Sequence, residues 1–352
     1  MTAAILLTGV TGTIGRFLAA RLTAAGHRVH GLVRNAAARR AEISHWIDAH
    51  GGSSARLLLV EGDLAKDGLG LAPADRAAIG EAELVFHLGA AVAWGLPRAT
   101  AHEVNVRGTE RLLALATQMR RLRRFVMVSG YGVALAPAEG PVRGGAYEAT
   151  KVEADRRTCA FAHEQGLPLT RVHPCALIGD SETGETLSRF GFGDLVSRIS
   201  RGALLAIPGG PRHWMPLVTV DYVANFLSRI PWTDSQPTTE YYLVDATTPA
   251  LAPLVQTVAR QACARVPRHR IPMAIARLVA YATRDSAMIE GLHFITEARF
   301  DTRAADLAAA AHGLAKPDIR HAIERSVAWL LREGDARSSR FVAKREAWPG
   351  GA

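Results

Sequence analysis

Cysteine is scarce in this sequence of 352 residues, which contains only Cys159, Cys175 and Cys263. These three residues are far apart, and their spacing matches neither a zinc-binding pattern nor a disulfide framework. No group of His, Asp and Glu has metal-ligand spacing either. We therefore expect no metal site, and we expect a reducing, cytoplasmic environment.

Long apolar runs are also missing. No stretch reaches the roughly 18 apolar residues that indicate a membrane-spanning helix, so we expect no membrane span. The apolar residues 3–8 lack the basic start of a signal peptide and lead directly into a glycine-rich turn. We interpret them as a buried first strand.

Acidic residues are outnumbered by basic ones, 33 against 42, which gives a net charge of +9. This charge is compatible with nucleic acid, anionic lipid or an acidic carrier protein as a partner. The sequence has no nucleic-acid recognition motif, so we do not expect nucleic acid to be the partner.

Short β-like runs alternate with helical patterns through the first half of the chain. This alternation is typical of an α/β fold, and we predict a doubly wound, Rossmann-type parallel sheet with a smaller C-terminal substrate lobe. The expected organisation is an NADP-binding domain over 1–178, with the sheet completed by segments near 215–247. Residues 179–214 and 248–334 form the lobe, and 335–352 a tail. The expected strands are 3–8, 28–33, 56–61, 83–88, 124–129, 167–172 and 241–244, and the clearest expected helices are 14–25, 101–118 and 147–164.

Residues 8–15, Thr-Gly-Val-Thr-Gly-Thr-Ile-Gly, follow the first predicted strand and open a helix. In this context Gly9 allows a tight turn, Gly12 lets the backbone approach a pyrophosphate, and Gly15 allows the helix to pack on the strand. The helix N-terminus also favours an anion. We therefore predict that cofactor phosphates contact Gly9, Thr11, Gly12, Thr13 and Ile14.

The residue after the second predicted strand is Arg34, where an NAD-binding protein would carry an acidic residue. A guanidinium binds the 2′-phosphate of NADP, and Arg39 and Arg40 follow shortly after. The alternative is a solvated basic helix start. NADP is favoured over NAD as the cofactor.

Tyr147 and Lys151 are four residues apart, so on a helix both side chains lie on one face. A phenol is a poor proton donor or acceptor at neutral pH unless a nearby cation lowers its pKa, and we expect Lys151 to do this. The two residues are the predicted catalytic pair.

Together with Gly62-Asp63-Leu64, residues 87–91 and Asn105, these motifs resemble the extended short-chain dehydrogenase/reductases. Segments 62–71, 90–94, 104–109, 178–184 and 216–224 resemble the thioester reductase branch, which includes fatty acyl-CoA reductases. The resemblance implies that Asn105 braces the active site and that Lys151 holds the nicotinamide ribose. It also implies cofactor contacts from Asp63, Leu64, Gly89, Ala90, Asn105 and Pro174, and from the catalytic pair itself.

The sequence departs from this family at the third catalytic group. Gly130 stands where the family carries a Ser or Thr, so Ser129, Tyr131 or water has to supply the hydrogen bond; we include Ser129 in the catalytic set. His173 replaces a usual Arg, and we interpret it as structural. Cys175 could suggest a covalent thioester mechanism, but a buried packing role is the more usual one for cysteine.

The resemblance implies an NADPH-dependent reductase that transfers hydride to a carbonyl of a hydrophobic substrate. An acyl thioester, bound to coenzyme A or to an acyl carrier protein, is the favoured substrate, and the product is an aldehyde or alcohol. Two alternatives stay open. One is a ketone or secondary-alcohol oxidoreductase of the hydroxysteroid-dehydrogenase or secondary-metabolite type, and the other is a non-catalytic NADP-sensing protein. The oligomeric state is left open as well.

Overall fold

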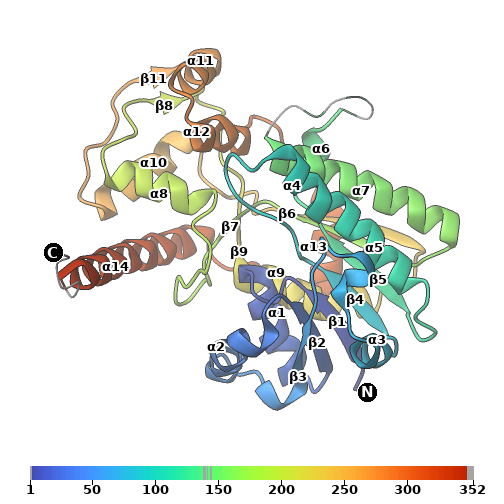
Figure 1. Ribbon diagram of the computed structural model, residues 1–352. Coiled ribbons are helices and arrows are strands. Elements are labelled where there is room, and N and C mark those ends of the chain that lie inside the picture. The colour runs from blue at the N-terminus through green and yellow to red at the C-terminus, as the bar shows by residue number, and fades with distance from the viewer. Residues whose placement is uncertain (1, 138–139, 141, 143–144, 347–352) are drawn as a thin grey trace.

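Seven parallel strands form the central sheet of the computed structural model, which describes residues 2–346 except 138–139, 141 and 143–144 (Figure 1). The strand order is β10-β6-β5-β4-β1-β2-β3, and every neighbouring pair is parallel. The predicted doubly wound fold is therefore confirmed. The strands are β1 (Ala4–Thr8), β2 (Arg28–Val33), β3 (Leu57–Glu61), β4 (Leu84–His87), β5 (Arg124–Val128), β6 (Leu169–Pro174) and β10 (Thr238–Leu243).

The strands read as nearly continuous apolar runs because helices cover both faces of the sheet. Within β1, Ile5 and Leu7 belong to one hydrophobic cluster, whereas Leu6 belongs to another on the opposite face. The first cluster includes residues of α1 (Thr13–Ala24), α2 (Ala36–Ala49) and α9 (Val220–Arg229). The second includes residues of α5 (Gly108–Ala116) and α7 (Ala146–Gln165).

Strands β1 and β4 are neighbours in the sheet, although β2 and β3 lie between them in sequence. The strands β2 and β3 are added on one side of β1, and the later strands are added on the other side. In open parallel sheets of this kind, the crevice beyond the carboxyl ends of the strands at such a change of side is where ligands bind. The loops that follow β1, β2, β4 and β5 all begin at this edge. The fold therefore brings together the sequence motifs that lie tens of residues apart.

Two smaller sheets lie outside the main one. β7 (Ala176–Ile178) pairs with β9 (Leu217–Thr219), and β8 (Ile207–Pro208) pairs with β11 (Arg270–Ile271). Of the segment near 215–247 that is expected to complete the sheet, only β10 joins it, on the edge of β6. The helices α8 (Phe192–Ser200), α10 (Leu251–Gln261), α11 (Met273–Thr283) and α12 (Ser286–Gly291) gather with β8 and β11 on one side of the molecule (Figure 1).

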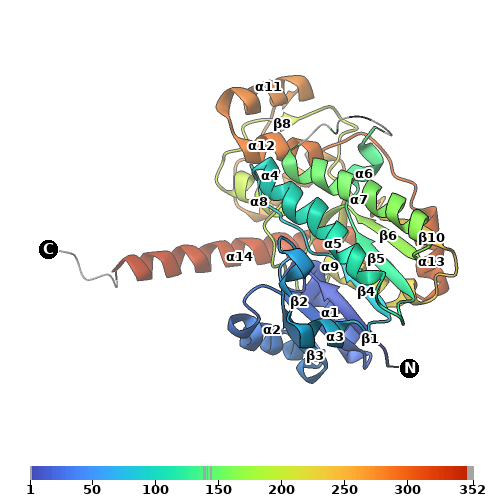
Figure 2. The same ribbon diagram turned by 45° about the vertical axis from the view of Figure 1, so that its right-hand side comes forward.

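Helix α14 (Ile319–Glu346) extends away from the rest of the chain (Figure 2). The expectation of a loose tail from residue 335 is wrong as far as residue 346, and residues 347–352 lie outside the described part. Extending a helix that packing has already nucleated requires only one further residue to be fixed per hydrogen bond. Residues 335–346 include several good helix formers among Ala, Arg, Lys and Glu, so the helix continues.

The remaining elements are short. They are α3 (Pro73–Ile79), α4 (Arg98–His102), α6 (Gly132–Leu135), α13 (Arg303–Ala311), the 3₁₀ turns at Ser54–Arg56, Asp67–Gly70, Ile230–Trp232 and Leu292–Phe294, and a π-helical segment at Glu103–Arg107. The predicted helix 101–118 is thus a run of α4, the π segment and α5. Among the described residues, no helix combines the length and apolar character needed to cross a membrane.

Candidate active site

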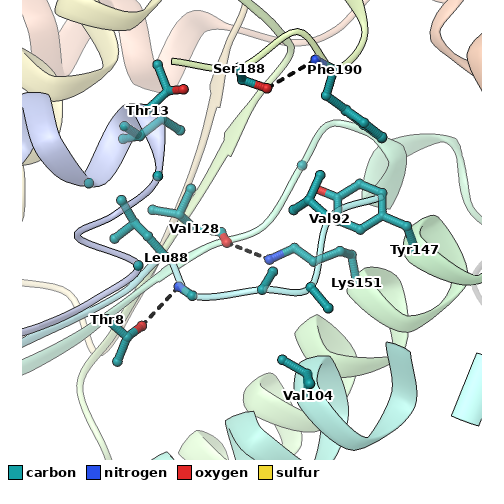
Figure 3. Close-up of a pocket in the computed structure, with 18 of the residues that line it drawn as sticks. Thr8, Thr13, Leu88, Val92, Val104, Val128, Tyr147, Lys151, Ser188 and Phe190 are labelled. Carbon is teal, nitrogen blue, oxygen red and sulfur yellow. Dashed lines mark hydrogen bonds between the residues drawn. The ribbon is translucent and has the colours of Figure 1, made fainter. Parts of the chain in front are cut away.

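A cleft of about 910 Å³ opens at the carboxyl ends of the strands. It runs from the glycine-rich turn after β1 to the start of α7 and on to the loops around Phe190 and Phe294. Figure 3 shows side chains around it from the start of α1, from α7 and from the loop that carries Phe190. The predicted site residues on its wall are Gly9, Thr11, Gly12, Thr13, Ile14, Arg34, Asp63, Leu64, Gly89, Ala90, Ser129, Tyr147, Lys151 and Pro174.

The glycine-rich turn is packed as tightly as the motif predicts. Gly9 has φ of +79°, and a Cβ atom there would stand 2.8 Å from the backbone nitrogen of Gly89. A Cβ atom at Gly15 would stand 2.1 Å from the carbonyl oxygen of Gly9, so only glycine allows α1 to approach the turn. At Gly12 that oxygen, at 3.3 Å, is the only atom nearby. Gly12 therefore leaves open space towards the cleft.

These features fit a dinucleotide pyrophosphate. Helix α1 begins at Thr13, directly after Gly12, so its first backbone N–H groups face the cleft wall that Gly12 leaves open. The hydroxyl of Thr13 is buried and has no hydrogen-bond partner among the described residues. A phosphate at this position would accept hydrogen bonds from both kinds of donor, and the helix dipole favours its charge.

The adenosine end of the cleft carries the predicted basic side chains. Arg34 and Arg39 line it and are exposed, but Arg40 does not line it. A feature the sequence analysis missed lies beside them. Glu61, the last residue of β3, accepts hydrogen bonds from the backbone nitrogens of Asn35 and Ala36 at 2.9 and 2.6 Å. No motif signals this contact, because it depends on how β2 and β3 pair.

Asn105 lies behind the cleft wall and does not line it, contrary to the expected cofactor contact. Its carboxamide oxygen accepts a hydrogen bond from the backbone nitrogen of Ala91 at 2.7 Å, and its Nδ2 donates to the hydroxyl of Thr150 at 3.0 Å. Asn105 is buried and sits in the π-helical segment. It therefore braces the loop after β4 against α7, which agrees with the bracing role that the family resemblance implies.

A second buried connection supports the same loop and was missed from the sequence. The ring of His87 is hydrogen-bonded to the hydroxyls of Thr8 and Thr109, each at 2.8 Å. The Thr8 hydroxyl also accepts from the backbone nitrogen of Gly89 at 2.9 Å. Burial, followed by the charge of Lys151, lowers the pKa of His87 to about 3. The ring is therefore neutral at physiological pH and acts as a structural link.

Tyr147 and Lys151 extend from the same side of α7 into the cleft (Figure 3). The Nζ of Lys151 donates to the carbonyl oxygen of Val128 at 2.9 Å. Burial lowers the pKa of Lys151 to about 8, although the charge of Asp155 acts in the opposite direction. Burial and then the charge of Glu148 raise the pKa of Tyr147. The expected lowering of the Tyr147 pKa by Lys151 is not found in this structure, because burial and the charge of Glu148 both raise that pKa.

The region of the third catalytic group is unusual. Ser129 is buried on the cleft wall, and its hydroxyl lies 3.5 Å from the carbonyl oxygen of Lys151, at the limit of a hydrogen bond. A Cβ atom at Gly130 would have no other atom within 4 Å. The buried hydroxyl of Tyr131 has no partner among the described residues. The backbone thus has room for a hydroxyl side chain at position 130.

His173 is fully buried and lies outside the cleft, with Nε2 at 3.0 Å from a carboxylate oxygen of Glu240 and its ring stacked on Tyr242. Cys175 does line the cleft, but burial raises its pKa well above the ordinary value. A neutral thiol is a weak nucleophile. The arrangement is therefore unfavourable for a covalent mechanism at Cys175.

Aromatic side chains from three separate segments gather at the far end of the cleft: Phe190 and Phe294 line it, and Trp94 packs against both. Phe190 stacks on Trp94 with ring centroids 3.8 Å apart, and its edge-to-face contact with Tyr147 has a centroid distance of 5.4 Å. Phe294 packs against both Trp94 and Phe190. Val92, Leu96 and Leu187 add aliphatic surface. This end suits an apolar substrate, and its aromatic members have no sequence signal because the fold alone brings them together.

Glu148 is the acidic residue at this end of the cleft. Burial, followed by the charge of Glu290, raises its pKa to about 7. Glu290 is itself buried, and one of its carboxylate oxygens accepts from the backbone nitrogen of Gly95 at 2.8 Å. Within the described ranges of the chain, no three His, Cys, Asp or Glu residues gather as metal ligands would.

The parallel sheet, the glycine-rich turn and the Tyr147–Lys151 pair together define an NAD(P)-dependent oxidoreductase of the extended short-chain dehydrogenase/reductase type. The model of the family described as male sterility protein matches residues 7–227, which is more than half of the chain. The chain belongs to this family.

Curated proteins and solved structures are similar to this chain. The PKS-NRPS hybrid synthetase cheA of Chaetomium globosum is 28% identical over 243 residues, a match that covers 62% of this chain and 5% of the synthetase. The chain thus spans a small part of that relative. Among solved structures, the terminal R domain from the myxalamid PKS-NRPS biosynthetic pathway has a TM-score of 0.74 and 23% identity, covering 95% of this chain and 91% of that one.

A thiolation-reductase di-domain from an archaeal non-ribosomal peptide synthetase has a TM-score of 0.71 at 14% identity. The similarity covers 95% of this chain and 76% of the di-domain. At such identities these structural similarities establish the fold, and the reaction has to be argued from the site.

Proposed function

We propose that this protein is an NADPH-dependent reductase that converts an acyl thioester to an aldehyde and a free thiol. The observation that carries the proposal is the continuity of the cleft. The glycine-rich turn at Gly12, the pair Tyr147 and Lys151, and the aromatic side chain of Phe190 all line this one cleft. A dinucleotide and an apolar acyl group would therefore meet beside the Tyr147 phenol.

NADPH, when bound, would supply the hydride that adds to the thioester carbonyl carbon. Tyr147 is the proton donor, because its phenol lines the cleft and, being protonated, can donate to the carbonyl oxygen; burial makes it a weak acid by itself, so the transfer depends on Lys151. Lys151 holds its ammonium in the same part of the cleft and stabilises the phenolate after the proton has left. Addition of the hydride and the proton gives a hemithioacetal. Its carbon–sulfur bond then breaks, the sulfur takes up the proton of the hemithioacetal hydroxyl, and the aldehyde and the free thiol are released.

The thioester, as opposed to a ketone, is favoured by the relatives. The curated match is to a PKS-NRPS hybrid synthetase, and one structural match contains a thiolation domain joined to a reductase. A phosphopantetheine-type thioester on such a carrier is the substrate we assign. The exposed Arg34 and Arg39 at the adenosine end favour NADPH as the hydride source.

We also propose an acidic acyl carrier protein as the partner, docking on α11. Four apolar residues of this helix, Ile275, Leu278, Val279 and Tyr281, are exposed by between 43% and 69%. Monomeric proteins rarely expose such a cluster without an interaction role. The residues 262–284 contain no acidic side chain, and the arginines among them are exposed: Arg265, Arg268, Arg270, Arg277 and Arg284. An apolar patch with a basic rim complements an acidic partner.

The test of the reaction is a panel of acyl-coenzyme A, acyl-pantetheine, aldehyde and ketone substrates incubated with NADPH. The proposal expects NADPH oxidation together with an equal amount of free thiol from thioesters. Ketone turnover without thioester turnover would instead support the hydroxysteroid-dehydrogenase-like alternative. NADPH binding with no oxidation by any substrate would favour a non-catalytic NADP-sensing protein.

The partner is tested separately with Leu278→Asp and Arg277→Glu. Both should raise KM for a carrier-bound acyl thioester and leave KM for the same acyl-pantetheine unchanged, because the pantetheine lacks the docking surface. Equal KM values of wild type and variants with the carrier would refute docking at α11.

A further inference from the structure

The start of helix α2 already holds a carboxylate. The two oxygens of Glu61 accept hydrogen bonds from successive backbone nitrogens, those of Asn35 at 2.9 Å and Ala36 at 2.6 Å. These amides are at the N-terminus of a helix of 14 residues, where the dipole favours an anion. Hydrogen bonds from Ala36 and Asn35 lower the pKa of Glu61, so it is ionised at neutral pH.

The backbone geometry here is specific. Asn35 adopts the left-handed conformation with φ of 57°, which turns the chain from β2 into α2 and directs both amides towards Glu61. The pairing of Val33 with Glu61 in the parallel ladder sets the height of the carboxylate. Arg34 lies in sequence between Val33 and Asn35, and its side chain lines the main cleft.

A hollow of about 160 Å³ adjoins the adenosine end of the main cleft. Arg34, Asn35, Glu61, Asp63 and Lys66 line it, so two basic side chains share it with two acids, of which Glu61 is the one bound to the amides of α2. A 2′-phosphate on the adenosine ribose would find Arg34 here. The backbone amides that could bind this phosphate already bind Glu61. The negative charge of Glu61 also repels the phosphate.

We propose that Glu61 is a specificity-determining residue that competes with the 2′-phosphate of NADP for the amides of α2, and so reduces the discrimination between NADP and NAD. The inference rests on the proposed use of NADPH, but it is independent of the substrate that is reduced. It assigns opposite effects to two neighbours: Arg34 attracts the 2′-phosphate and Glu61 opposes it.

The test measures binding of two cofactor fragments, 2′,5′-ADP and 5′-AMP, by calorimetric titration of the wild type, Glu61→Gln and Glu61→Ala. Removing the charge should lower Kd for 2′,5′-ADP about tenfold, because a charge-assisted competitor is lost. Kd for 5′-AMP should change less than about twofold, since it has no 2′-phosphate. Glu81→Gln is the matched control, because Glu81 precedes the amino end of β4, on the opposite edge of the sheet from the cleft, and should leave both values unchanged.

The outcomes separate this inference from the proposed function. Equal changes for the two fragments, or no change, would show that Glu61 only caps α2 and would overturn the inference. If the wild type binds neither fragment, the cofactor assignment fails and the inference with it. If the fragments behave as expected and no thioester is reduced, the inference stands and only the proposed reaction fails.

Discussion

The side-chain nitrogen of Lys151 donates a hydrogen bond to the carbonyl oxygen of Val128, 2.9 Å away at the carboxyl end of β5. The hydrogen bond of this predicted catalytic lysine is thus to the sheet and not to Tyr147 on the same helix. Together with burial, it holds the ammonium at a fixed place on the cleft wall. Tyr147, one turn earlier on α7, is held by its contact with Phe190. The predicted catalytic pair is therefore positioned by two different parts of the fold.

Replacing Tyr147 by Phe tests the proton donor. The ring can keep its contact with Phe190 while the hydroxyl is lost, so we expect turnover to fall by roughly 10²–10⁴-fold, the range for a lost general acid. Affinity for NADPH, measured by fluorescence titration, should barely change. Lys151→Ala should impair both turnover and cofactor binding. If Tyr147→Phe keeps most of its activity, another donor is at work.

Gly12→Val and Gly15→Val separate binding from folding within one turn. The open space at Gly12 would admit the valine side chain, which then occupies the place of the pyrophosphate. We expect a folded protein with no measurable NADPH binding and only a small fall in the thermal midpoint, because the Gly9 oxygen at 3.3 Å has to shift slightly. At Gly15, a Cβ atom would stand 2.1 Å from the carbonyl oxygen of Gly9, so this variant should lose stability. Normal NADPH affinity in folded Gly12→Val would exclude the turn from the site.

The free energy of unfolding should depend on pH through Glu148. Its folded pKa of about 7 lies above its unfolded value of 4.5, so between these pH values the folded state binds more protons than the unfolded state. Unfolding free energy therefore falls as pH rises from about 4.5 to 7, by about 1–3 kcal/mol for this one group. Glu148→Gln removes this dependence and should be more stable than wild type at pH 8.

Urea unfolding of wild type and Glu148→Gln at pH 5 and pH 8 measures this effect. The difference between the two proteins should be larger at pH 8 than at pH 5. The exposed residue Glu81 provides the control, since Glu81→Gln removes a carboxylate without removing a buried charge. Parallel pH profiles of Glu148→Gln and wild type would contradict the prediction.

Local sequence signals were enough to predict much of the fold. The second strand was predicted at its observed bounds, and the first strand and helix α1 within about a residue, because apolar runs and the glycine-rich turn set them locally. The five residues of that turn that are predicted to contact the cofactor all line the cleft: Gly9, Thr11, Gly12, Thr13 and Ile14.

Features that depend on tertiary contacts could not be predicted in this way. Glu61 reaches Asn35 only because β2 and β3 pair in one particular register. The spacing of Tyr147 and Lys151 places them on one helix face, but it does not show how deeply the phenol is buried. Burial reverses the expected direction of its pKa, and part of that burial comes from Phe190, more than forty residues further along the chain.

Gly130→Ser tests the missing third catalytic group. Because no atom lies within 4 Å of a Cβ atom at this position, a serine fits without displacing a neighbour. Gly130 lines the cleft near Tyr147, so the new hydroxyl can donate to the substrate carbonyl oxygen. If the wild-type site lacks this donor, kcat for an acyl-pantetheine substrate should rise about tenfold, while NADPH affinity stays the same.

Variants of the two neighbouring residues test which group donates a hydrogen bond to the substrate carbonyl oxygen in the wild type. Ser129→Ala should have little effect if its hydroxyl is held by the backbone, whereas Tyr131→Phe should lower kcat if the unpartnered Tyr131 hydroxyl is the present donor. In the double variant Gly130→Ser with Tyr131→Phe, the serine should then restore the activity that the loss of the phenol removes. A fall in kcat for Gly130→Ser, with Tyr131→Phe unaffected, would show that water polarises the carbonyl and that the serine displaces it.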